Sequence, residues 1–275
     1  MSGDVRAQGP LCVAVGGLGA IGFRVASALD DGIPGLRLNA VSARDGDRAA
    51  DRVAGFRRPP AIKELADLAS DADVVVECAP PAVFREVADP ALRCGRIFIP
   101  MSVGQLLVNP DLLELAEEHL ARILVPSGAM LGLDALRAAS EGQIESVRLV
   151  TRKPPRSLAG APHLEKIGVD IETLTEPVRV FEGNAYDAAA AFPANINVGA
   201  ALSLAGIGPE RTMIEIWVDP TLERNTHRIT VESDSANFEM SVQSIPTENP
   251  ATGRLTPLSV INTLRMLTAT LQIGS

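Results

Sequence analysis

The sequence predicts an α/β protein in which a doubly wound parallel sheet is followed by a second, α+β domain. Three observations support this prediction. Short β-branched runs alternate with helical segments in the first half, and a glycine-rich turn follows the first of these runs. After about residue 126 this regular alternation of expected strands and helices ends. The chain has 275 residues, which is enough for two domains of ordinary size.

In the first half the apolar runs are short and show little alternation, so both faces of the predicted sheet are expected to be covered. The expected strands are residues 11–15, 36–41, 73–77, 96–100 and 121–125. The expected helices follow the glycine-rich turn to about residue 29, and then occupy residues 63–70 and 110–119. Strands that alternate with helices at this spacing form βαβ units.

In the second half the expected strands are residues 146–151, 213–218, 227–232 and 237–243, the last two forming a hairpin. Ile214, Ile216 and Val218 alternate with Glu215, Trp217 and Asp219, which predicts an antiparallel sheet with one exposed face. Expected helices are residues 133–139, 197–205 and 258–271. The domain boundaries that follow are 1–127 and 128–254, with a C-terminal helix at about 255–275 packing back on the first domain.

The composition excludes some partners. Twenty-five basic and 34 acidic residues leave a net charge of −9, and aromatic residues make up only 3% of the chain. Nucleic-acid binding needs a basic surface and usually aromatic stacking platforms, and an anionic membrane surface needs basic residues as well. We therefore expect no nucleic-acid and no membrane partner.

Cys12, Cys78 and Cys94 are too few and too unevenly spaced for a disulfide framework or a zinc site. They lie in or beside apolar runs, so we expect reduced cysteines in the core and no bound metal. The N-terminal segment MSGDVRAQGP is polar, and no run is long and apolar enough to span a bilayer. These features predict a soluble, cytoplasmic protein.

The glycine-rich turn predicts a dinucleotide site. Gly17, Gly19 and Gly22 form a GxGxxG motif, with Ala20 and Ile21 between the last two, directly after an expected strand and at the start of an expected helix. In this context the first glycine makes the turn, the second lets the backbone approach a pyrophosphate, and the third lets helix and strand pack closely. The first domain is therefore expected to be Rossmann-type.

The end of the second expected strand indicates which dinucleotide is bound. An acidic residue about 20 residues beyond the motif would bind the ribose 2′-hydroxyl of NAD. Here Ser42 and Arg44 stand at that end, a hydroxyl and a cation suited to the 2′-phosphate of NADP, while Asp45 follows slightly later. These residues predict that both NAD and NADP are used.

Three segments of the second half carry polar side chains beside expected strands or helices. They are Pro126–Ala129, Phe192–Val198 with Asn195 and Asn197, and Asp219–His227. His227 is the histidine that has polar residues beside it in the sequence. His119 and His163 are expected to lie on the surface or to have their hydrogen bonds satisfied locally.

Together these segments resemble the L-aspartate dehydrogenase family along nearly the whole chain. The resemblance rests on the GxGxxG motif and on Ser102-Val103-Gly104, Pro126-Ser127-Gly128-Ala129, Gly132-Leu133-Asp134-Ala135-Leu136, Thr151-Arg152-Lys153-Pro154-Pro155, Phe192–Val198 and Asn225-Thr226-His227. Met130-Leu131 departs from the smaller residues of the family.

The resemblance implies a Rossmann domain, a catalytic and dimerisation domain, and NAD(P)-dependent oxidation of L-aspartate to iminoaspartate, then oxaloacetate and ammonia, or the reverse. It implies that His227 is catalytic and that Ala129 and Asn195 or Asn197 contact the nicotinamide, with Asn197 better spaced from His227. It also implies a homodimer. Arg152, Lys153 and Lys166 remain equal candidates for binding the substrate carboxylates, and iminoaspartate synthesis for NAD production remains open beside aspartate breakdown.

Two other classes remain as alternatives. One is a two-domain reductase of a semialdehyde or cyclic imine, although a phosphorylating semialdehyde enzyme needs a cysteine in the second half and all three lie before residue 95. The other is a non-catalytic dinucleotide sensor, which has no need of a histidine for proton transfer.

Overall fold

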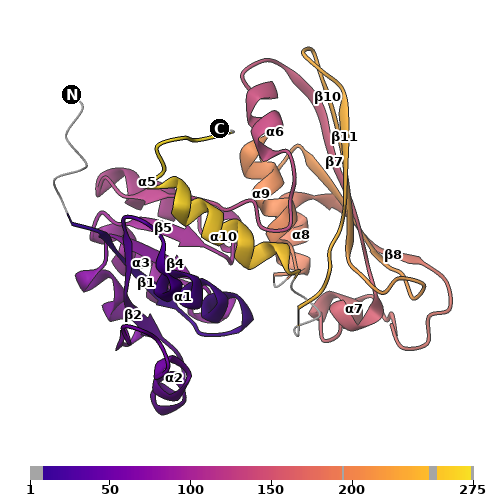
Figure 1. Ribbon diagram of the computed structural model, residues 1–275. Coiled ribbons are helices and arrows are strands. Elements are labelled where there is room, and N and C mark those ends of the chain that lie inside the picture. The colour runs from indigo at the N-terminus through magenta and orange to yellow at the C-terminus, as the bar shows by residue number, and fades with distance from the viewer. Residues whose placement is uncertain (1–8, 194, 248–252, 274–275) are drawn as a thin grey trace. The chain divides into compact units, whose positions relative to one another are not determined.

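The computed structural model describes residues 9–193, 195–247 and 253–273, and within them the chain forms two units. The first unit comprises residues 9–101, 111–126 and 260–272. The second comprises residues 102–110 and most of 127–259. Each unit is built on its own β-sheet (Figure 1).

The sheet of the first unit has six strands in the order β3-β2-β1-β4-β5-β6, and all neighbouring pairs are parallel. Its strands are β1 Leu11–Gly16, β2 Leu36–Ser42, β3 Ala61–Ile62, β4 Val74–Glu77, β5 Ile97–Pro100 and β6 Arg122–Ile123. Its helices are α1 Ala20–Gly32, α2 Gly46–Val53, α3 Phe84–Arg93 and α5 Asp111–Glu118, with 3₁₀ turns at Leu65–Asp71 and Pro81–Val83. This strand order is that of a Rossmann-type doubly wound sheet, which confirms the predicted fold class.

The strands of this sheet are apolar because both faces are covered. On one face Val13, Val15 and Val76 pack with residues of α1 and α2 and with Val260 and Leu264 of the C-terminal helix α10 (Leu255–Met266). On the other face, the rings of Phe98 in β5 and Phe84 in α3 lie 5.7 Å apart. The carboxyl ends of β1 and β2 are thereby fixed at one edge, where ligands of such sheets bind.

The second sheet has five strands in the order β11-β10-β7-β9-β8. Its strands are β7 Ile144–Lys153, β8 Val178–Asn184, β9 Thr212–Val218, β10 Thr226–Ser233 and β11 Phe238–Gln243. The helices of this unit are α4 Gly104–Val108, α6 Leu133–Ala139, α7 Pro162–Lys166, α8 Ala185–Ala191 and α9 Asn197–Ala205, with a 3₁₀ turn at Pro155–Ser157. The β10–β11 hairpin is antiparallel, as predicted, but β7 and β9 are parallel, so the sheet is mixed rather than antiparallel throughout.

The two faces of the second sheet differ. Ile214, Ile216 and Val218 of β9 are fully buried on the face that α6, α8 and α9 cover (Figure 1). On the opposite, uncovered face Trp217 is partly exposed, but Glu215 is buried because it pairs with Arg148 and accepts a hydrogen bond from Trp217 Nε1. This uncovered face of the second sheet is therefore called its open face.

The expectation for the cysteines was partly wrong. All three are free, but Cys94 is exposed, and Cys12 and Cys78 are only partly buried. Cys94 follows the last turn of α3, where the chain turns through Gly95 toward β5 and leaves the thiol outside the packed layers.

Candidate active site

The glycine-rich loop joins β1 to α1, and its three glycines have different surroundings. Gly17 has a φ of +99°, and a Cβ on it would lie 2.5 Å from the carbonyl oxygen of Cys78. A Cβ on Gly22 would lie 1.8 Å from the carbonyl oxygen of Gly17. A Cβ on Gly19 would meet no atom within 4 Å. The first and third glycines are thus required by packing, and the second leaves the loop open to a ligand.

The N-terminus of α1 has room for an anion. Gly19 is its N-cap, Ala20 and Ile21 are its first residues, no side chain caps it, and no acidic residue lies in its first turn. Its first N–H groups and the positive end of its dipole are therefore available to a phosphate. The loop fits the pyrophosphate of a dinucleotide.

Residues beside the loop include one cation that sequence reasoning missed. Arg52 of α2 donates to the carbonyl oxygen of Leu18, and its guanidinium lies 4.3 Å from the ring centroid of Phe23. These two contacts hold a positive charge against the glycine-rich loop. No local motif in the sequence connects Arg52 with this loop.

The end of β2 carries the residues expected to select the cofactor. Ser42 is buried, and its carbonyl oxygen accepts a hydrogen bond from Gly17 N. Arg44 is exposed and lines an open pocket of about 460 Å³ together with Lys63, which the sequence reasoning did not single out. Asp45 caps α2 by accepting from Arg48 N, so this carboxylate is already engaged.

In the second unit, His227 lies opposite Thr151 in the antiparallel pair of β10 and β7. The two side chains are 4% exposed each, and Thr151 Oγ1 lies 2.9 Å from His227 Nδ1. Burial, with a smaller effect from the charge of Lys153, lowers the pKa of His227 to about 3. The imidazole is therefore neutral near pH 7. Within the described residues, its Nε2 atom has no hydrogen-bond partner.

Lys153 follows Thr151 by two residues on β7, so both side chains lie on the same face of the sheet. Lys153 is 4% exposed, and its Nζ donates to the carbonyl oxygen and to Oδ1 of Asn195, each at 3.2 Å. Burial lowers the pKa of Lys153 to about 8. The structure thus brings His227, Thr151, Lys153 and Asn195 together.

The loop with the two asparagines is anchored by apolar residues. Phe192 is buried, and its ring centroid lies 5.1 Å from that of His163 and 6.0 Å from that of Phe181. Asn197 begins α9, and its Oδ1 accepts a hydrogen bond from Gly104 N at the start of α4. Among the described residues, no partner contacts Asn197 Nδ2, so this amide keeps a donor for a ligand.

Ala129 lies on a separate loop of the same unit. Gly128, with a φ of +63°, donates through its backbone N–H to Ser259 Oγ, and Met130 N donates to the carbonyl oxygen of Ser127. These bonds hold the loop, and Ala129 remains partly exposed on it.

The two other candidate cations are more exposed than Lys153. The guanidinium of Arg152 is 4.9 Å from the ring centroid of Trp217 on the open face, and its Nη1 is 3.5 Å from Asp219 Oδ2. Lys166 is exposed at the end of α7. The other histidines have local partners, since His119 contacts the Leu115 carbonyl and His163 packs in the Phe181–Phe192 cluster.

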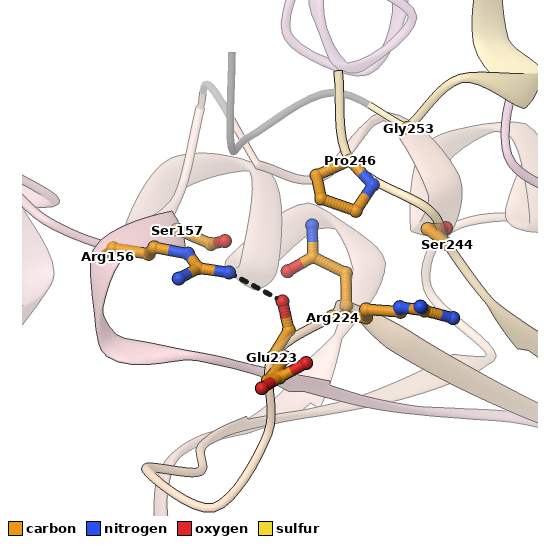
Figure 2. A pocket seen from close by; sticks show the side chains of 8 residues that line it. Arg156, Ser157, Glu223, Arg224, Ser244, Pro246 and Gly253 are labelled. Atoms are coloured by element: carbon orange, nitrogen blue, oxygen red, sulfur yellow. Dashed lines mark hydrogen bonds between the residues drawn. The ribbon is translucent and has the colours of Figure 1, made fainter. Parts of the chain in front are cut away.

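A narrow pocket lies at the start of β10 (Figure 2). Arg156 Nη2 donates to the carbonyl oxygen of Glu223 across it, at 2.6 Å. Asn225 Oδ1 and Ser244 Oγ are buried there without a hydrogen-bond partner in the described part of the chain. The pocket has no room for a water molecule. It marks the point where Ser244 N donates to the Asn225 carbonyl and ties β10 to the segment after β11.

The described residues have the features of neither a metal site nor a membrane span. No cluster of three or more His, Cys, Asp or Glu side chains is arranged to bind a metal ion there. No helix among them has the length and apolar character needed to cross a membrane.

Comparison with known proteins relates both halves of the chain to dehydrogenases. Residues 134–267 match the family model for the C-terminal domain of aspartate dehydrogenase, and residues 17–126 match that for the NAD-binding domain of homoserine dehydrogenase. An L-aspartate dehydrogenase of Bradyrhizobium diazoefficiens is 51% identical over 99% of this chain and 97% of its own length. L-aspartate dehydrogenase 3 of Bordetella bronchiseptica is 50% identical over 96% and 98% of the two chains. The crystal structure of aspartate dehydrogenase from Thermotoga maritima superposes with a TM-score of 0.73 at 26% identity, covering 96% of this chain and 99% of that one.

Proposed function

The chain belongs to the L-aspartate dehydrogenase family, and from this premise we propose how its own residues carry out NAD(P)-dependent oxidation of L-aspartate. The observation that carries the mechanism is the buried pair of His227 and Thr151 beside Lys153. It places a neutral base and a cation on one face of the second sheet. The glycine-rich loop of the first unit provides the dinucleotide site.

The overall reaction converts L-aspartate, water and NAD(P)⁺ to oxaloacetate, ammonia, NAD(P)H and a proton. When bound at the glycine-rich loop, the dinucleotide would supply the hydride acceptor for oxidation of aspartate at Cα to iminoaspartate. Water then adds to the imine carbon, and loss of ammonia gives oxaloacetate. The protein must orient the amino acid, activate the water and move protons.

His227 is the group suited to the proton transfers. If Nδ1–H donates to Thr151 Oγ1, Nε2 keeps its lone pair and can take a proton from the attacking water. Nε2 has no partner among the described residues, so it is available to that water. In the reverse direction the protonated ring donates this proton to the hydroxyl group of the carbinolamine, which leaves as water and gives iminoaspartate.

The cofactor contacts are assigned by chemistry. Gly17, Gly19 and Gly22, with the backbone N–H groups of Ala20 and Ile21, hold the pyrophosphate. Ala129 and an asparagine would line the nicotinamide when the dinucleotide is bound. Asn195 Oδ1 accepts from Lys153 and Asn197 Oδ1 accepts from Gly104 N, so both amides keep an Nδ2 donor, and the spacing to His227 makes Asn197 the better partner for the nicotinamide carboxamide.

Both NAD and NADP are accepted in this proposal, without a sharp preference. Arg44 and Lys63 provide cations for a 2′-phosphate, and Ser42 ends the strand beside them. Glu64 and Asp67 also line the pocket, and their carboxylates offset part of the positive charge and can accept a hydrogen bond from a ribose hydroxyl.

We also propose that the first unit is the dinucleotide-binding domain and that the second is the catalytic and dimerisation domain. Two copies would pair through the open face, where Trp217 is partly exposed and lines a pocket of about 410 Å³ with Arg152 and Arg228. The sedimentation mass of the protein tests this, with Trp217→Glu as the variant expected to give monomers. A monomeric wild-type protein contradicts it.

The three free thiols fit a reducing compartment, and we place the protein in the cytoplasm. Fractionation of cells tests this assignment. Growth of a deletion strain on media with and without an NAD precursor tests the direction of the reaction in the cell. It also tests whether the reaction supplies iminoaspartate for NAD synthesis.

A turnover assay with L-aspartate and either cofactor tests the proposed function. We expect reduced nicotinamide to appear together with ammonia in equal amounts. A protein that binds the dinucleotide but turns over neither aspartate nor iminoaspartate would be a sensor. Turnover of a semialdehyde or a cyclic imine in place of aspartate would favour the reductase alternative.

A further inference from the structure

Lys153 is a buried cation that has no counter-ion among the described residues. It is 4% exposed, and no Asp or Glu side chain in the described ranges lies within ion-pair distance of its Nζ. Burial of an unpaired ammonium is costly, and such groups are usually paired or bind a ligand of opposite charge. The two oxygens of Asn195 are neutral acceptors and leave the positive charge uncompensated.

The surroundings of Lys153 explain why the charge has no internal partner. On the neighbouring strand β9 it lies beside Val218, which is fully buried and apolar. Asp219, the next residue, pairs with Arg152 on the open face. The titratable group that interacts with Lys153 in the described part of the chain is His227, which is neutral near pH 7. Within residues 9–193, 195–247 and 253–273 no group supplies an anion at Lys153, so this ammonium is suited to an anionic ligand.

We propose that Lys153 binds a carboxylate of the dicarboxylate substrate and orients it toward His227. This rests on the function proposed above and chooses among the three cations that the sequence left equal. Arg152 lies on the opposite face of the sheet, and Lys166 is exposed at the end of α7.

A carboxylate bound at Lys153 also changes His227. The positive charge of Lys153 is one of the two causes that depress the pKa of the imidazole. A bound carboxylate cancels that charge and brings a negative one near the ring, so both effects make His227 easier to protonate. The substrate thereby prepares the histidine to receive a proton only when it is bound.

Binding of succinate to protein saturated with NADH tests the proposal without turnover, because succinate has two carboxylates and no amino group to oxidise. We expect Lys153→Met to weaken succinate binding by about 10- to 100-fold, the effect of losing a charge-assisted hydrogen bond. Lys153→Arg keeps the charge and should bind more tightly than the methionine variant. Lys166→Met is the matched control and should bind as the wild type does.

The pH dependence supplies a measurement on the wild-type protein alone. Because the pKa of Lys153 is about 8, succinate affinity should fall as the pH rises through that value, approaching tenfold per pH unit above it. Lys153→Arg should remove this fall, since a guanidinium stays charged. A residue that only supports the fold would change the melting temperature but not this profile.

Three results would overturn the inference. They are a folded Lys153→Met protein whose succinate affinity stays within about twofold of the wild type, a wild-type affinity that does not fall above pH 8, and no succinate binding to the wild-type complex. Failure of the proposed function is a separate result. A protein that binds succinate through Lys153 but never oxidises aspartate would keep the anion site and lose the assigned reaction.

Discussion

Thr151 Oγ1 lies 2.9 Å from Nδ1 of His227, and the two residues are 76 positions apart in the chain. The antiparallel register of β7 and β10 places them directly opposite each other. This buried hydroxyl engages Nδ1 and holds the ring in place, so that Nε2 is the nitrogen left for a ligand.

Thr151→Val removes this hydroxyl with little change in volume. We expect kcat to fall by about 3- to 10-fold, because one neutral hydrogen bond that orients the base is lost. Thr151→Ser keeps the hydroxyl and should retain most of the activity. Nitrogen NMR shifts of the His227 ring should show a mixed tautomer in the valine variant alone. Equal activity of the valine and serine variants would show that the hydroxyl does not orient the ring.

His227→Ala should lower kcat by about 10²- to 10⁴-fold, the usual effect of removing a positioned proton-transfer group. His227→Asn should be no more active, because an amide can hydrogen-bond but cannot carry the proton. Cofactor affinity should be nearly unchanged in both, since the glycine-rich loop belongs to the other unit. Steady-state rates and melting temperatures are measured on the same preparations. A folded alanine variant with near wild-type kcat would remove His227 from the mechanism.

Acid should destabilise the wild-type protein through His227. Its pKa is about 3 in the folded protein against an ordinary value near 6.5, so the unfolded chain binds the extra proton first. The contribution of neutral His227 to the free energy of unfolding is complete above about pH 6.5. It is lost as the pH falls toward 3, by at most about 1.4 kcal/mol per pH unit. Urea unfolding of the wild type and of His227→Asn between these pH values measures the difference. A stability difference that stays constant with pH contradicts the burial of a neutral imidazole.

Two glycines of the loop provide a matched pair of valine substitutions. Gly19→Val should abolish dinucleotide binding but leave the melting temperature nearly unchanged, because the new side chain enters open space where the pyrophosphate binds. Gly22→Val should lower the melting temperature, because its Cβ would lie 1.8 Å from a backbone oxygen. Cofactor fluorescence titration and thermal unfolding distinguish the two. Normal NAD affinity in Gly19→Val would mean that the phosphates bind elsewhere.

Arg44→Ala should weaken NADP more than NAD, by about 1–3 kcal/mol, if a charge-assisted bond to the 2′-phosphate is lost. Lys63→Ala should act in the same direction, although its ammonium also pairs with Asp71. Dissociation constants of both cofactors for each variant provide the comparison. Equal losses for NAD and NADP would place Arg44 away from the 2′ position.

The elements with strong local patterns could be predicted from the sequence. The strand–glycine loop–helix unit of β1 and α1, the helix α9 and the β10–β11 hairpin lie close to their predicted residues. Helix α8 was missed because Ala185–Ala191 is mostly alanine and shows no apolar period. The parallel β7–β9 pair was missed because alternation within a strand does not report the direction of its neighbour.

The site could be predicted only in part. His227 and the asparagines could be named from short motifs, but their partners depend on strand pairing between distant segments. Arg152 and Lys153 are adjacent cations, and the sequence shows that they face opposite sides of a strand without showing which side holds the histidine. Burial of Lys153 against Asn195 appears only once β7 and the loop before α9 are placed together.

The alternation of Thr151, Arg152 and Lys153 makes this part of β7 intolerant of insertions and deletions. One codon gained or lost just before Thr151 would turn Arg152 inward and Lys153 outward, and would exchange the two surfaces of the strand in a single event. The other end of the strand is more forgiving, because its pairing with β10 already shifts between Glu232 and Ser233, opposite Ser146 and Ile144. Length variation among descendants of this gene should therefore collect near residue 144 and be absent between residues 149 and 153.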